Sequence, residues 1–153
     1  MKKWKRIVIH CSDSFWGSVS EIRDWHVNGN GWSDIGYQYI IDNGKIKTDY
    51  YLDCMNGTIE IGRPIDGDMI AESSEKGAHA YGYNSDSIGI CLIGKERFTP
   101  FQFSGLFFLV SDLMTRFKID LENVVGHYEL DPKKTCPNID MDSFRKLLSK
   151  VIS

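Results

Sequence analysis

Short apolar stretches, either alternating with polar residues or rich in β-branched residues, recur along this chain and predict β-strands. They occupy residues 4–10, 37–41, 46–52, 58–61, 87–93 and 121–125. The Asn43-Gly44 pair between the second and third stretches predicts a hairpin turn, because Asn-Gly tolerates the positive φ values of a tight turn. The stretch 87–93 is the most apolar, so we expect it at the centre of the sheet.

Three other stretches carry apolar residues at helical spacing. The first follows a capping box at residues 18–21 and stops at the glycine-rich residues 29–31. The second begins with Thr99 as N-cap and Pro100 at the first helical position, where the missing N–H of proline costs nothing. Asp140 is expected to cap the third. The order of strands and helices predicts an α/β fold with a mixed central β-sheet flanked by helices.

Length and charge narrow the class of protein. A chain of 153 residues is most simply one domain, here residues 1–153, and such a domain buries roughly 70% of its unfolded surface. The formal net charge is −3, and basic residues cluster only at residues 2–6. This distribution does not support binding to nucleic acid, which normally requires a clustered basic face.

The apolar runs and the cysteines indicate where the protein is made. No run in the sequence approaches the roughly 20 residues of a membrane span, so we expect no membrane insertion. The apolar run after residues 2–6 is far shorter than the roughly 7–15 residues of a secretory h-region, so no signal peptide is predicted and the protein is expected to be cytoplasmic as synthesised. The four cysteines are widely spaced, which favours free thiols over a disulfide framework.

Candidate chemistry lies near the carboxyl end, where His127 and Cys136 stand nine positions apart. Imidazole and thiolate together are ligands that Zn²⁺ prefers. The pair alone does not decide between a metal site and a loop histidine beside a buried thiol, because nine residues fits no tight zinc-finger spacing. His10 is the candidate third ligand, since His10 and His127 each follow an apolar strand. His, His and Cys leave one tetrahedral position open, which is the pattern of a catalytic zinc.

Two further residues fit such a site. Lys134, two residues before Cys136, would place a cation near the metal, where it can stabilise the oxyanion formed when water attacks a carbonyl. Tyr37 opens the strand after the first helix, and its hydroxyl can assist the same step. His26, on the first helix, is interpreted as a partly exposed or core-edge histidine.

Seven ordered blocks resemble the type 2 N-acetylmuramoyl-L-alanine amidases, the family of the phage amidase-type lysozymes and the peptidoglycan recognition proteins. They are HCS at 10–12, GW at 31–32, GYQYII at 36–41, GR at 62–63, AHAYGYN at 78–84, SIGI at 87–90 and KTCP at 134–137. The similarity runs from about Ile7 to the last helix. It implies the fold of that family and hydrolysis of the amide between the lactyl group of N-acetylmuramic acid and the L-alanine of the stem peptide.

The resemblance also assigns roles to residues. It implies one zinc per chain, with His10, His127 and Cys136 as ligands, and it implies that Tyr37 and Lys134 are catalytic. Three further residues in the matching blocks are predicted to bind substrate: His79, Arg63 and Asn84. For His79, which lines the cleft in relatives, the expected role is substrate contact or support of the metal ligands.

One segment departs from the family pattern. Residues 45–55 look like an insertion, which could form an extra hairpin at the rim of the groove, so the substrate preference of the family need not transfer. Cys54 lies inside this segment and has no family role that we can assign.

Several biological settings agree with the resemblance. The absence of a predicted export signal favours a phage or prophage endolysin, expected to be a monomer, that a holin-type partner releases to the peptidoglycan. A cytosolic muropeptide-recycling amidase also lacks a signal, but such relatives tend to have an aspartate where Cys136 stands. A non-catalytic peptidoglycan-binding recognition protein is a further alternative, in which the cysteine ligand is lost. Certain phage amidases also contact RNA polymerase, and no residue here argues for or against that partner.

Overall fold

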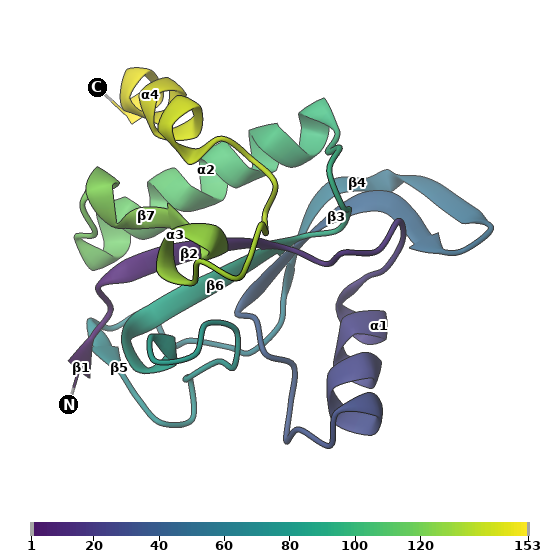
Figure 1. The fold of residues 1–153 in the computed structure, drawn as a ribbon, viewed down its shortest axis with the longest axis horizontal. Helices are drawn as coiled ribbons and strands as arrows, with labels where there is room; N and C mark the ends of the chain where they lie inside the picture. Colours follow the sequence, from purple (N-terminus) through teal and green to yellow (C-terminus); the bar gives the residue numbers. More distant parts are fainter. Residues whose placement is uncertain (1, 153) are drawn as a thin grey trace.

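The computed structural model describes residues 2–152, and at its centre lies a mixed five-stranded β-sheet (Figure 1). The strands are β2 (Arg6–Cys11), β3 (Tyr39–Lys47), β4 (Tyr50–Ile61), β6 (Ser87–Leu92) and β7 (Val124–Gly126). Their order across the sheet is β4-β3-β6-β2-β7, with β3 and β4 antiparallel and the other neighbours parallel. The predicted mixed sheet and the central position of the most apolar strand are confirmed.

Helices and short elements complete the chain. They are α1 (Val19–Asp24), a π-helical turn (Trp25–Gly29), 3₁₀ turns (Asn84–Asp86 and Leu121–Asn123), α2 (Pro100–Phe117), α3 (His127–Leu130) and α4 (Met141–Ile152), with β1 (Lys2–Lys3) pairing with β5 (Ile70–Ala71). Among residues 2–152, there is no helix whose length and apolar character would let it cross a membrane.

Alternating side chains divide the sheet between two apolar layers, as the period of a β-strand requires. Ile7 and Ile9 of β2 face the layer under α2 and α4, where Phe107 and Phe144 stack with ring centroids 4.9 Å apart. The opposite face packs under α1 (Figure 1). His10 follows Ile9 in the strand, so its side chain points to the α1 face, at the end of β2.

The two predicted helix starts have different outcomes. Thr99 caps α2 as predicted: its hydroxyl accepts from the backbone amide of Gln102 at 3.0 Å, and the side-chain Oε1 of Gln102 accepts from the backbone amide of Thr99 at 2.9 Å. The capping box predicted at residues 18–21 is wrong, because the Ser18 side chain makes no capping bond to the part of the chain that the structure describes. The carboxylate of Glu60, from β4, instead accepts from the first helical amide, Val19, at 3.1 Å.

The hairpin turn predicted at Asn43-Gly44 is also wrong. Strand β3 runs through this pair to Lys47, and β4 runs to Ile61 through another Asn-Gly pair, Asn56-Gly57. The predicted strand 46–52 is therefore divided between β3 and β4. The pairing of β3 with β4 shifts register around Asn43, and Gly44 has φ 95°. A positive φ suits a β-bulge as well as a tight turn. The Asn-Gly pair thus correctly indicated a positive φ, but the pair lies at a bulge within β3 and not in a turn. Residues 45–55 form the outer end of this hairpin; their being an insertion in the family remains a prediction.

Candidate metal centre

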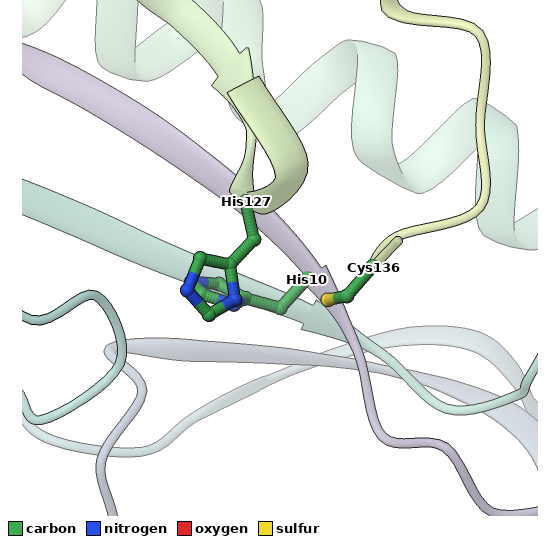
Figure 2. Close-up of side chains that lie close together, drawn as sticks. All are labelled: His10, His127 and Cys136. Carbon is green, nitrogen blue, oxygen red and sulfur yellow. The ribbon is translucent and has the colours of Figure 1, made fainter. Parts of the chain in front are cut away.

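Three side chains predicted as metal ligands meet at one end of the sheet. The ligating atoms of His10, His127 and Cys136 all lie within 4.8 Å of one another (Figure 2). Strand pairing explains the meeting of the two histidines, because Ile9 of β2 pairs in parallel with Gly126 of β7 and each histidine is the next residue. Their ring centroids are 4.6 Å apart.

Hydrogen bonds from two backbone amides hold Cys136 beside the two histidines. The amide of Tyr128 donates to the Cys136 carbonyl at 2.9 Å, and the amide of Cys11 donates to the Cys136 sulfur at 3.1 Å. The hydrogen bond between the two thiols lowers the pKa of Cys11 to about 7 and, together with burial, raises the pKa of Cys136. Binding of a metal by Cys136 would therefore release a proton.

An ion pair from α4 holds the segment that carries His127. Arg145 donates to both carboxylate oxygens of Glu129 at 2.8 and 2.9 Å, and to the carbonyl of Val124 at 2.9 Å. The same glutamate accepts from the amide of Gly126 at 2.9 Å. The end of β7 and the start of α3 are thus fixed on both sides of His127. A rigid support of this kind keeps a ligand in place while neighbouring loops bind substrate.

Burial keeps the histidines of the centre neutral. His10 is 1% exposed, and its pKa lies well below the usual value because of burial and the nearby His79 and His127. Burial also lowers the pKa of His79 to about 4, and the pKa of His127 is lowered by burial and by the Lys134 ammonium. Neutral imidazole is the form that binds a metal.

Aromatic side chains, those of Tyr37 and Trp32, form part of the lining of the pocket that contains the candidate ligands. The ring of Tyr37 lies 5.1 Å from that of His10, and burial raises the pKa of Tyr37 well above its usual value. Tyr37 therefore keeps its proton near neutral pH and is available as a hydrogen-bond donor. Both Lys134 and its neighbour Lys133 are exposed and line the same pocket of about 440 Å³, as do Trp32 and the three candidate ligands.

Known proteins are similar to this chain in sequence and in architecture. A family model described as N-acetylmuramoyl-L-alanine amidase matches residues 1–139. The endolysin of Escherichia phage T7 is 34% identical over 148 residues, and the match covers 88% of this chain and 81% of that protein. The endolysin of Klebsiella phage KP32 is 33% identical over 147 residues, with 89% of this chain and 82% of that protein covered. The chain belongs to the N-acetylmuramoyl-L-alanine amidase family.

Solved structures agree with this family assignment. The N-acetylmuramoyl-L-alanine amidase LysC from Clostridium intestinale URNW has a TM-score of 0.75 at 26% identity, with 96% of this chain and 86% of that chain covered. The peptidoglycan recognition protein PGRP-SA of Apis mellifera has a TM-score of 0.67 at 21% identity, with 90% and 78% covered, and shares the fold. The resemblance to type 2 amidases and the fold class predicted from the sequence are confirmed.

Two residues predicted to bind substrate lie outside the lining of the pocket in this amidase family member. Arg63 donates to the carbonyls of Ile35 at 3.1 Å and Lys76 at 2.7 Å. The side-chain oxygen of Asn84 accepts from two backbone amides, those of His79 and Ala80, each at 2.8 Å. Both side chains support the loops around the centre, and their contact with substrate stays a prediction.

One histidine has a larger part in the centre than the sequence indicated. The ring of His26 lies 4.6 Å from Trp32 and 5.6 Å from Tyr37, and its Nδ1 accepts from the amide of Gly36 at 2.9 Å. It therefore holds the turn that leads to Tyr37. His26 directly follows Trp25, the last apolar residue at helical spacing in the predicted first helix. This place carried no signal for the contact, which depends on the chain returning through residues 32–37.

Proposed function

We propose that this protein is a zinc-dependent N-acetylmuramoyl-L-alanine amidase that hydrolyses the lactyl–L-alanine amide of peptidoglycan. The observation that carries the proposal is the convergence of His10, His127 and Cys136 within 4.8 Å at the floor of a pocket. The family match and the name of LysC support the choice of bond.

The donor set fits one zinc ion per chain. Two imidazoles and one thiolate are borderline-soft ligands, and three protein ligands leave a position free for water or substrate, as in catalytic zinc sites. Bound there, zinc would supply Lewis acidity toward a carbonyl oxygen and would lower the pKa of water. Cys136 and its position beside the two histidines argue against a recognition protein that only binds muropeptides, and against a recycling amidase of the kind that has aspartate here.

Tyr37 and Lys134 supply the remaining chemistry. Water adds to the lactyl carbonyl carbon, the amide C–N bond breaks, and the nitrogen leaves as the amine of L-alanine. The Tyr37 hydroxyl, kept protonated by burial, donates to the oxyanion that develops on the carbonyl oxygen. The Lys134 ammonium at the pocket rim adds positive charge at the same place. Removal of one such donor typically costs about 10²- to 10³-fold in turnover.

A phage or prophage endolysin is the biological role that we propose. Two relatives, of which the match with this chain covers 81% and 82%, are named endolysins of phages. In this role the enzyme reaches the cell wall after a holin-type partner opens the membrane, and it acts as a monomer on peptidoglycan or muropeptides. Contact with RNA polymerase stays a prediction, for which a pull-down with the polymerase is the direct test.

A muralytic assay on purified cell wall tests the proposal. We expect clearing with zinc, no clearing after chelation, and mass-spectrometric products that carry a new L-alanine amine. The Cys136→Ala variant should lose both zinc and activity, whereas the matched Cys54→Ala variant, which removes an exposed thiol on the outer hairpin, should retain both. Clearing that survives chelation, or full activity of Cys136→Ala, contradicts zinc catalysis, and a new reducing end in the products identifies a glycosidase instead.

A further inference from the structure

The structure assigns to His79 the role of a positioning residue that directs His10 to bind the metal through Nδ1. Nothing in the ligand set itself determines which nitrogen of His10 binds, because either ring nitrogen can serve in proteins. A chain of two hydrogen bonds from the central strand makes the choice. This inference rests on the proposed zinc site, and its first test needs neither activity nor metal.

The first of the two hydrogen bonds involves a backbone carbonyl of β6. The Nε2 atom of His79 lies 3.1 Å from the carbonyl oxygen of Ser87. A carbonyl oxygen only accepts, so this contact requires the proton of His79 to be on Nε2. In the neutral ring the other nitrogen, Nδ1, then carries a lone pair and accepts.

The second hydrogen bond determines which ring nitrogen of His10, the candidate ligand, carries the proton. The Nε2 atom of His10 lies 2.9 Å from Nδ1 of His79. Because that Nδ1 accepts, Nε2 of His10 must donate, which leaves the lone pair of His10 on Nδ1. The opposite direction would place a proton on Nδ1 of His10, and this ring would then offer no lone pair to a metal. Outer partners that orient a histidine in this way are general in metal sites.

The packing holds His79 in one place. Its side chain is largely buried, with the residue 8% exposed, and its backbone amide donates to Asn84 at 2.8 Å. A Cβ atom built on Gly89 would lie 2.7 Å from the His79 ring, so glycine at this position of β6 makes room for the imidazole. The AHAYGYN and SIGI blocks therefore cooperate in seating one ring. His79 lines the pocket beside His10 and contacts the ring of that ligand, so the role assigned to it is to orient His10 and not to act as a catalytic residue.

Nitrogen NMR of the metal-free protein tests the direction of the chain. With ¹⁵N-labelled histidine at neutral pH, we expect the His10 signals to show a protonated Nε2 and an unprotonated Nδ1, and zinc addition to shift Nδ1. A protonated Nδ1 in the metal-free protein, or coordination through Nε2, would overturn the inference. If zinc does not bind at all, the proposed function fails while the tautomer of His10 is still read from the same spectra.

Two variants separate positioning from packing. His79→Leu removes both ring nitrogens, and we expect zinc affinity, measured by competition with a chromophoric chelator, to fall about 10- to 100-fold. His79→Asn places a side-chain oxygen near the former Nδ1, so it should accept from His10 and recover most of the affinity and the Nε2–H signature. Equal zinc affinity of His79→Leu and the unaltered protein would overturn the role. If the leucine variant does not fold, the spectra of the unaltered protein decide alone.

Discussion

Lys134 shows how a single side chain acquires a function from its surroundings. In the sequence it is notable only for standing two residues before Cys136 and for matching the KTCP block. In the structure its ammonium lowers the pKa of His127, and it lines the pocket together with its exposed neighbour Lys133. The neighbour is a natural control, because it has the same charge and shares the loop.

We predict that Lys134→Ala retains zinc and loses about 10²- to 10³-fold in turnover, because it removes charge from the transition state and no ligand from the metal. Metal content and the rate on a defined muropeptide measure the two effects separately. Lys133→Ala should keep most of the activity. Loss of zinc from Lys134→Ala, or an equal loss of turnover in Lys133→Ala, would show that the loop acts through its structure or its total charge.

The β3–β4 hairpin is the element in which sequence and structure differ most. Its two Asn-Gly pairs became bulges inside long strands, and its Asp42 is fully buried. Burial and the neighbouring Glu60 raise the pKa of Asp42 from 3.8 to about 9. In the unfolded chain this carboxyl loses its proton near pH 4, but in the folded chain it keeps the proton up to about pH 9. Its contribution to stability is therefore largest below pH 4 and decreases as the pH rises to 9.

We predict that Asp42→Asn becomes more stable relative to the unaltered protein as the pH rises from 5 to 8. The asparagine does not titrate, whereas the aspartate loses up to about 1.4 kcal/mol of folding free energy per pH unit in this window. Urea unfolding of both metal-free proteins at pH 5 and 8 gives the difference. Asp49→Asn, at the exposed turn of the same hairpin, is the control and should show no such trend. A stability difference that is independent of pH would mean that Asp42 is ionised in the folded protein.

At the scale of the whole molecule, the candidate metal centre joins parts of the chain that are far apart in sequence. His10 belongs to the first strand of the main sheet, whereas His127 and Cys136 precede the last helix. A ligand that binds only the folded state stabilises it by about 4 kcal/mol at 1,000 times its dissociation constant. Zinc is therefore expected to stabilise the whole domain and not only the loop of Cys136.

We predict that chelation lowers the Tm by roughly 8–16 °C, from about 4 kcal/mol of binding energy and the usual 2–4 °C per kcal/mol for a domain of this size. Calorimetry with and without chelator measures the shift. In Cys136→Ala the shift should be much smaller, since a ligand is missing. A shift of the same size in that variant would place the stabilising metal elsewhere.

Much of the fold and the convergence of the three candidate ligands could be predicted from the sequence, because both depend on patterns that are visible along the chain. Apolar stretches located most of the strands, Thr99-Pro100 located the start of α2, and the candidate ligands were named by the HCS and KTCP blocks and by the apolar strand that precedes His127. These signals depend on neighbours along the chain or on blocks whose order is preserved. They also predicted that β6 would be central, because only a strand covered on both faces is apolar throughout.

Contacts between distant segments were decided only by the tertiary structure. Glu60 replaced Ser18 at the start of α1, and the Asn-Gly pairs became bulges because β3 and β4 continue to pair beyond them. The hydrogen-bonded chain from Ser87 through His79 to His10 exists because three strand and loop segments meet at one point. Burial at that point also sets the protonation of Tyr37 and His79. Hydrogen-bond partners and desolvation depend on position in space, and local sequence records neither.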